Sequence, residues 1–252
     1  MGGIRESKCF LSMHKLLETA IADYQMINPG DHVLAGLSGG KDSSMLLKLM
    51  ARKKISTTND FKLSAVFVKM GFPKDDEISE YLRKFSTENG VNYFEIEKSL
   101  EKIMASEKKQ PCYLCSRTRR LALFDLADEI NANVIAFGHH RDDFVQTFMM
   151  NLLFNGTLEA MKPNNPFFQG KYRIIRPMVY IKESSIKAEI ENSGIRTFDS
   201  GCPFGHVSQR AFIRKLLEEV CGRDKTIKFN VFKALYNQKP DFLLKKPSKD
   251  IL

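Results

Sequence analysis

Apolar and polar positions along the chain predict strands and helices in alternation. Short apolar runs of the kind found in buried parallel strands lie at residues 33–37, 63–68, 91–96, 134–137 and 173–176. Segments with apolar residues at steps of three or four predict helices at 6–26, 45–50, 78–88, 121–130, 144–153 and 185–192. This repetition is typical of an α/β protein with a doubly wound, mostly parallel sheet, here of five strands.

Two stretches interrupt the alternation and suggest how the chain is divided. Residues 98–120 are polar, rich in lysine and contain a C-x-x-C pair, and residues 155–172 are interpreted as a long loop. We expect an N-terminal helix in 1–30, a central α/β domain in 31–200 and a basic, helical C-terminal region in 201–252. In a doubly wound sheet the ligand lies at the carboxyl ends of the strands.

Net charge adds a candidate partner to this picture. The chain has 39 Lys and Arg against 30 Asp and Glu, a net charge of +9. Residues 222–252 contribute eight basic and three acidic side chains, and so supply +5 of that excess. Such a surface attracts a polyanion at long range. A solvated, lysine-rich tail explains the same residues equally well.

The composition also indicates where the protein is located and which chemistry its cysteines serve. No window approaches the roughly 18 consecutive apolar residues of a membrane span, and MGGIRESK at the start has no apolar signal stretch. We therefore expect a cytoplasmic protein with no membrane partner. Five unevenly spaced cysteines do not form a secreted disulfide framework, so the C-x-x-C pair indicates metal or redox chemistry.

Residues 38–43, SGGKDS, follow the first strand and begin a helix. Gly39 and Gly40 let the backbone fold tightly, and the first N–H groups of the helix attract an anion. The same segment contains two hydroxyl donors, Ser38 and Ser43, and a cation, Lys41. The pattern is not a Walker A loop, because that motif needs Gly and Ser or Thr where this chain has Ala35 and Asp42. Asp42 would repel a phosphate unless Mg²⁺ or a positive dipole intervenes, so its presence favours a metal-bridged pyrophosphate site. A glycine-rich turn without a ligand is the alternative.

A second polar segment follows the fourth strand, again where a strand ends. Residues 138–143 read GHHRDD, beginning with Gly138 and His139. Asp142 and Asp143 open a helix, and capping is one explanation of an acid there. Capping needs only one acid, so a second beside a phosphate loop favours a metal-binding or catalytic role. Each histidine could equally be a packed, hydrogen-bonded side chain.

Three cysteines form a candidate metal site. Cys112 and Cys115 stand three positions apart and are followed by arginines that favour thiolates, while Cys202 lies in a turn rich in glycine and proline. They could hold three corners of a [4Fe–4S] cluster, or bind zinc together with His206. Spacing alone favours zinc. Cys9 and Cys221 sit in helical patterns and are interpreted as structural.

Taken together, these motifs resemble the PP-loop ATP pyrophosphatase family, and within it the tRNA 2-thiocytidine biosynthesis branch. The shared features are SGGKDS, C-x-L-C-S-R-x-R-R, GHHRDD followed by Q-T, and a later cysteine before Q-R, in that order over residues 10–220. The resemblance implies ATP and Mg²⁺ at the phosphate loop and a [4Fe–4S] cluster on Cys112, Cys115 and Cys202. It also implies catalytic roles for Lys41, Asp42, Asp143 and Arg119, and nucleotide contacts from Ser38, Gly39, Gly40, Ser43, Gly138 and His139.

The activity that the resemblance implies is adenylation of C2 of an anticodon-loop cytidine in tRNA, followed by replacement of the C2 oxygen with sulfur. A cysteine desulfurase or other sulfur donor, and a homodimer, are expected partners. One departure is Asp199, which stands where the family often has a further cysteine. The rival functions are a 2-thiouridine synthetase or PP-loop amidoligase, and a non-catalytic nucleotide-binding or redox-sensing module. Five cysteines are too few for the paired zinc fingers of the 2-thiouridine branch.

Overall fold

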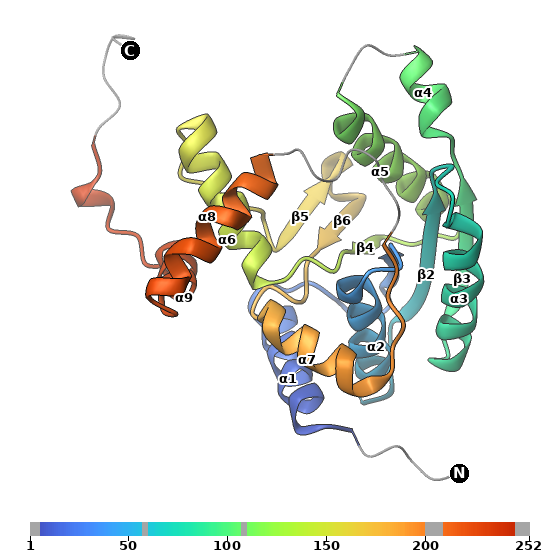
Figure 1. Ribbon diagram of the computed structural model, residues 1–252. Helices are drawn as coiled ribbons and strands as arrows, with labels where there is room; N and C mark the ends of the chain where they lie inside the picture. The colour runs from blue at the N-terminus through green and yellow to red at the C-terminus, as the bar shows by residue number, and fades with distance from the viewer. Residues whose placement is uncertain (1–5, 57–59, 107–109, 200–208, 245–252) are drawn as a thin grey trace.

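One sheet of six strands lies at the centre of the computed structural model, which describes residues 6–56, 60–106, 110–199 and 209–244. Its order is β3-β2-β1-β4-β6-β5 (Figure 1). The strands are β1 (His32–Leu37), β2 (Lys62–Lys69), β3 (Asn92–Glu97), β4 (Val134–Ala136), β5 (Asn164–Phe167) and β6 (Tyr172–Ile175). All neighbouring pairs are parallel except β5 and β6. The predicted doubly wound, mostly parallel α/β fold is therefore confirmed.

The expected number of five strands is one too low for the described chain. Each expected strand is present, but residues 155–172, interpreted as a loop, contain the additional strand β5. Its sequence, NNPF, has no alternating apolar pattern, so only backbone pairing with β6 defines it. Pro166 is tolerated because β5 is an edge strand whose outer side needs no hydrogen bonds.

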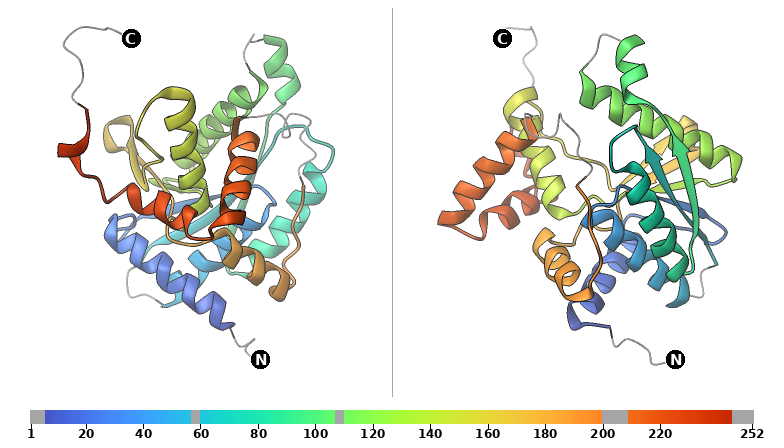
Figure 2. Two further views of the ribbon diagram at one scale, coloured as in Figure 1. Left: turned by 60° about the vertical axis from the view of Figure 1, so that its left-hand side comes forward. Right: turned by 45° about the vertical axis from the view of Figure 1, so that its right-hand side comes forward.

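Helices cover both faces of the sheet, as two views of the chain show (Figure 2). On one face lie α1 (Lys8–Asp23), α2 (Lys41–Ser56), α3 (Asp75–Glu88) and α7 (Glu183–Ser193), and on the other lie α4 (Leu100–Ser106) and α5 (Pro111–Glu129). Each face has its own apolar core. The central strands between them are buried on both sides, as the burial of all three residues of β4 illustrates.

Near the C-terminus, the chain packs against the helix that follows β4. This helix, α6 (Arg141–Met150), contacts both α8 (Gln209–Arg223) and α9 (Ile227–Ala234). Ile213, Leu217 and Phe232 are buried there and join the core of the sheet, so α8 and α9 pack onto the same body as the sheet. In the described part of the chain, no helix combines the length and hydropathy needed to cross a membrane.

Helix α5 begins earlier than the sequence pattern suggested. The apolar period predicted a helix from residue 121, with the C-x-x-C pair before it, whereas α5 starts at Pro111. Proline is favoured in a first helical turn because its missing N–H is not needed there. Cys112, Cys115 and Arg119 therefore lie on one helix, rather than Arg119 lying on a helix that follows the cysteines.

Candidate active site

The predicted phosphate loop joins β1 to α2 at the carboxyl edge of the sheet. The Ser43 hydroxyl accepts a hydrogen bond from the Ser38 backbone N–H (3.1 Å) and donates to the Gly40 carbonyl (3.1 Å), which keeps the loop closed. Gly39 has a φ of +75°, and a Cβ there would lie 2.7 Å from the Ile78 side chain. Because α2 begins at Lys41, its positive end points toward the loop. The loop thus has the geometry of an anion cradle.

Gly138 brings a second loop against the first. A Cβ on Gly138 would lie 2.9 Å from the backbone carbonyl carbon and oxygen of Asp42, so the two loops are in backbone contact. Within the second loop, the His140 backbone N–H donates to the Asp143 carboxylate (3.0 Å). The close approach of Gly138 to Asp42 joins two motifs that are about a hundred residues apart in the sequence.

The paired acids at the start of α6 have different environments. Asp142 is buried, accepts the Glu183 backbone N–H (2.9 Å) and pairs with Lys228 (3.1 Å), so its carboxylate connects α6 to α7 and α9. Asp143 instead lines the cavity beside the phosphate loop. In addition to its contact with His140, the Asp143 carboxylate lies 3.6 Å from Arg210, which belongs to the Q-R pair at the start of α8.

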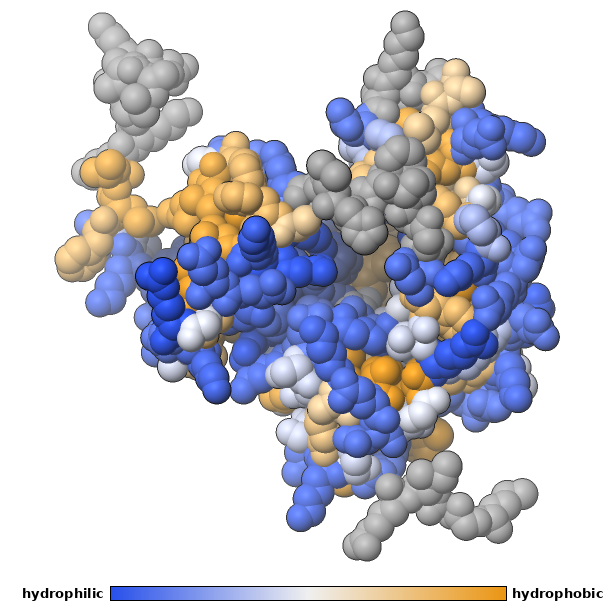
Figure 3. Space-filling view, viewed as in Figure 1, coloured by the Kyte–Doolittle hydropathy of each residue, from blue (hydrophilic) through white to orange (hydrophobic). Residues whose placement is uncertain are grey.

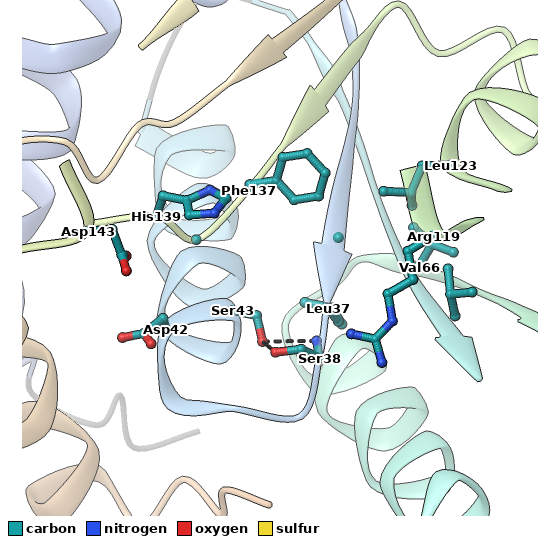
Figure 4. Close-up of a pocket in the computed structure, with 13 residues that line it drawn as sticks. Leu37, Ser38, Asp42, Ser43, Val66, Arg119, Leu123, Phe137, His139 and Asp143 are labelled. Carbon is teal, nitrogen blue, oxygen red and sulfur yellow. Dashed lines mark hydrogen bonds between the residues drawn. The ribbon is translucent and has the colours of Figure 1, made fainter. Parts of the chain in front are cut away.

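A cavity of about 290 Å³ opens between the two loops and the ends of β1 and β2 (Figure 4). Its polar side is formed by Ser38, Ser43, Gly138, Asp42 and Asp143, and its apolar side by Leu37, Val66, Val68, Leu123 and Phe137. The two carboxylates lie on the same side in Figure 4, away from the Arg119 guanidinium. A polar end beside an apolar wall suits a ligand with phosphates and a flat ring.

The two cavity carboxylates fit a Mg²⁺ ion better than a fully protein-held metal. One oxygen of Asp42, Oδ1, is buried and has no hydrogen-bond partner within the described residues; the nearest histidine nitrogen, Nε2 of His140, is 3.5 Å away. No group of three or more metal-binding side chains occurs among the described residues. Mg²⁺ in nucleotide sites typically uses one or two carboxylates and takes its other ligands from phosphates and water.

Lys41 pairs with two acids, one of which the sequence did not single out. Its ammonium lies 2.9 Å from Asp42 and 3.1 Å from Glu183. Burial by itself lowers the pKa of Lys41, but the two carboxylates outweigh it and the net pKa is raised. Burial raises the pKa of Glu183, but Lys41 and then Lys187 lower it to about 2. Both side chains are therefore charged at neutral pH.

A second cavity, of about 410 Å³, adjoins the first. Cys112 and Cys115 line it, and four residues line both cavities: Arg119, Leu123, Phe137 and His139. The C-x-x-C pair and the phosphate loop therefore lie on opposite sides of one thin wall of side chains. The space-filling view shows a hollow on the face of the molecule drawn in Figure 3, between α6 and α8 on one side and α3 and α5 on the other.

His139 is a neutral side chain in this shared wall. Burial, and then the positive charge of Arg176, lower its pKa to about 4, although Asp143 opposes them. Its Nδ1 is buried and has no partner within the described residues. The imidazole can therefore donate or accept one hydrogen bond to a ligand without carrying a charge.

The structure brings together many of the predicted site residues but not all. Ser38, Asp42, Ser43, Gly138, His139, Asp143 and Arg119 line the first cavity, and Cys112 and Cys115 line the second. Gly39, Gly40 and Lys41 shape the loop without lining either cavity. Cys202, like His206, falls outside the described residues.

Glu183 and Arg176 are site residues that sequence reasoning missed. Glu183 opens α7, far along the chain from the loop that it contacts, and nothing in its local pattern distinguishes it from a solvent-exposed acid. Arg176 directly follows β6. That position was a usable signal, because the carboxyl ends of parallel strands meet at the same edge of the sheet.

Comparison with known proteins gives consistent relatives. Residues 12–220 match a family model described as a PP-loop domain. The chain is 33% identical over 249 residues to the tRNA-cytidine(32) 2-sulfurtransferase of Pelobacter propionicus, a match covering 96% of this chain and 91% of that protein. It is 36% identical over 253 residues to the protein of the same name from Pseudomonas syringae pv. syringae, covering 95% and 88% of the two chains.

Among solved structures, the chain is similar to the U34-tRNA thiolase NcsA from Methanococcus maripaludis, determined with its [4Fe–4S] cluster. The TM-score is 0.74 at 21% sequence identity, over 92% of this chain and 80% of that one. At that identity the likeness shows a shared fold.

Proposed function

The chain belongs to the PP-loop family and, within it, to the tRNA-cytidine(32) 2-sulfurtransferases, and we propose that it activates a tRNA cytidine with ATP and replaces the C2 oxygen with sulfur. The family resemblance predicted from the motifs is thereby confirmed. The protein is an enzyme of ATP-dependent tRNA thiolation. The assignments of individual residues that follow are parts of the proposal.

ATP would occupy the first cavity, with its phosphates at the loop and its adenine against the apolar wall. The loop N–H groups and the Ser38 and Ser43 hydroxyls would bind phosphate oxygens. Asp42 and Asp143 would hold Mg²⁺ between them and the phosphates. Leu37, Val66 and Phe137 are suited to contact the adenine ring, because they are apolar and line the same cavity.

In the activation step, the C2 oxygen of the base would attack the α-phosphorus and pyrophosphate would leave. Charge develops on the departing phosphates, where the positive end of α2 and the loop N–H groups stabilise it. Arg119 faces the loop from the shared wall (Figure 4) and could stabilise the α-phosphate on the side of the incoming base. The proposed role of Lys41 requires its ammonium to move from Glu183 toward the phosphates.

The described part of the second cavity fits an iron–sulfur cluster. Two thiol side chains line it near arginines that favour thiolates, and the cavity is large. Cys202 is proposed as the third ligand; Phe198, four residues earlier in the sequence, donates a backbone hydrogen bond to Gly39 (2.9 Å). When bound, the cluster would supply sulfur at the oxidation level of sulfide to C2 of the activated base, and the C2–O bond would break with AMP as the leaving group. The protein would hold the base between the cavities and keep water from C2.

Two further parts of the proposal concern partners. A cysteine desulfurase or another donor would supply the sulfur. Homodimer formation, which the resemblance implied, also stays a prediction, and the apolar stripe of α1 adds no support for it. Phe10, Met13 and Leu17 of that stripe are buried in this chain's own core.

The wall that the two cavities share carries the proposal. A thiolase must activate a base with ATP and deliver sulfur to the same carbon, so its nucleotide site and its sulfur site must adjoin. Here the two cavities adjoin across the four residues that line both of them: Arg119, Leu123, Phe137 and His139. A PP-loop amidoligase or a purely nucleotide-binding module has no need for thiols beside that wall. A redox-sensing module would use such thiols, but its loss would leave every thiolated nucleoside of tRNA unchanged.

Mass spectrometry of tRNA nucleosides from cells with and without the gene tests the proposal. We expect 2-thiocytidine to disappear on deletion and to return with the wild-type gene. Complementation with Asp42→Ala should fail, whereas Asp76→Ala, an exposed acid on α3, should restore the nucleoside. Loss of 2-thiouridine instead would identify the 2-thiouridine synthetase alternative, and no change in any thiolated nucleoside would refute thiolation.

A further inference from the structure

The second cavity contains more positive charge than the two thiols require. Arg119, Arg120 and Arg176 all line it, together with the neutral His139. No carboxylate from the described residues lines it. Three basic side chains face one space, and thiolates at Cys112 and Cys115 would offset only two of these charges.

Arg176 is the most constrained of the three. It follows β6 directly, and its guanidinium donates to the Lys162 carbonyl (2.6 Å). Burial, and then the charge of Arg120, lower the pKa of Arg176 to about 10. Its Nε is buried and has no partner in the described chain, as is true of the Nε of Arg119. Unpaired buried donors and adjacent like charges are costly, so the arrangement is expected to have an anionic ligand.

The phosphates of ATP are not the expected ligand of these arginines. The phosphate loop lines only the first cavity, and Arg120 and Arg176 line only the second. The RNA substrate supplies other anions. A base that is modified in a single-stranded loop is turned outward into its pocket, which brings the adjoining phosphodiester groups to the pocket mouth. The planar guanidinium matches the oxygen atoms of such a group.

We propose that Arg176 and Arg120 bind a phosphodiester group adjoining the target nucleotide, so that the mouth of the second cavity, where Arg120 is exposed, is the entry site of the RNA. This rests on the proposed function, whose substrate is a tRNA. Binding of the phosphate would place the base at the wall shared with the ATP site. Arg176 is thus a positioning residue, separate from the adenylation chemistry.

Binding of an anticodon stem–loop RNA with cytidine at position 32 tests the assignment. With anaerobically prepared holoprotein, Arg176→Gln should weaken RNA binding about tenfold, the usual loss for one charged hydrogen bond. Arg83→Gln removes the same charge from an exposed side chain on α3 and should change RNA affinity by less than about twofold. ATP affinity should be equal in both variants. Equal RNA affinities, or a selective loss of ATP binding in Arg176→Gln, would overturn the proposal.

Neutral methylphosphonate linkages in the RNA identify the phosphate directly. One placed beside cytidine 32 should weaken binding to the wild type about tenfold and cause no further loss with Arg176→Gln. If Arg176→Gln does not fold, the wild type and Arg120→Gln, a change at an exposed side chain, provide the same comparison. If binding is not weakened by a methylphosphonate linkage on either side of that nucleotide, the inference is refuted. Failure of the wild type to bind any tRNA would instead refute the proposed function.

Discussion

The backbone N–H of Phe198 donates a hydrogen bond of 2.9 Å to the carbonyl of Gly39. Gly39 lies in the phosphate loop, and Phe198 lies in the extended segment after α7 that leads toward Cys202. The Phe198 ring also packs against Tyr81 at 5.2 Å between ring centroids, and the Arg196 backbone N–H donates to the Tyr81 hydroxyl. The nucleotide loop and this segment are therefore joined through α3.

Phe198→Ala tests that connection. Loss of a half-buried ring should reduce the free energy of unfolding by about 1–2 kcal/mol. If the segment positions Cys202, iron content per chain should fall as well. Phe242→Ala, at a ring that is 85% exposed, is the matched control and should change neither quantity. Unaltered iron content in a destabilised Phe198→Ala protein would show that the segment has no role in holding the cluster.

Gly138→Ala should separate the phosphate loop from the GHHRDD loop. The new Cβ would lie 2.9 Å from the backbone of Asp42, a contact that only backbone movement can relieve. We expect a loss of about 1–3 kcal/mol in stability, as for other overpacked sites, and a large loss of pyrophosphate release. Gly222→Ala, in α8 with open space around the added methyl, should leave both unchanged. Normal pyrophosphate release by a folded Gly138→Ala protein would contradict a requirement for close loop contact.

Glu183→Gln should change how stability depends on pH. The folded-state pKa of Glu183 is about 2, below the ordinary value of 4.5, mainly because Lys41 offsets the effect of burial. The stabilisation is therefore present above about pH 4.5 and is lost as the pH falls toward 2. At pH 7 the variant should be about 1–2 kcal/mol less stable than wild type after allowance for partial solvent exposure. Unfolding by urea at a series of pH values measures this.

The difference between wild type and Glu183→Gln should shrink as the pH is lowered from 4.5 toward 2. Glu191→Gln, at an exposed position on the same helix, should match wild type throughout. A stability difference that is constant across that range would mean that the ion pair with Lys41 is not its cause.

Cys115→Ser should separate the two halves of the reaction. We expect the purified protein to lose most of its iron and the broad visible absorption of a cluster, because two thiolates hold a cubane less firmly than three do. ATP binding should remain, because Cys115 lines only the second cavity. Cys221→Ser, on α8, should retain iron. A colourless wild-type protein that contains zinc would support the zinc alternative.

Local pattern was sufficient for much of this protein. Apolar runs and their spacing identified five of the strands, most clearly β1, β2 and β4, because a strand buried on both faces must be mostly apolar. The order of strand, glycine-rich turn and helix identified the anion loop at residues 38–43, since that chemistry resides in consecutive backbone groups. The C-x-x-C pair could likewise be recognised from residues close together in the sequence. The start of α5 and the edge strand β5 were missed because their signals, a proline at the first helical position and backbone pairing, are weak in sequence.

Only the tertiary structure decided which distant residues share a site. Asp142 and Asp143 are adjacent and chemically identical in sequence, yet packing against α7 and α9 makes one a buried anchor and leaves the other in the cavity. Glu183 and Arg176 became site residues through the same long-range packing. The reason is physical: burial and the distance between charges depend on elements far apart in the chain, and no local spacing encodes them.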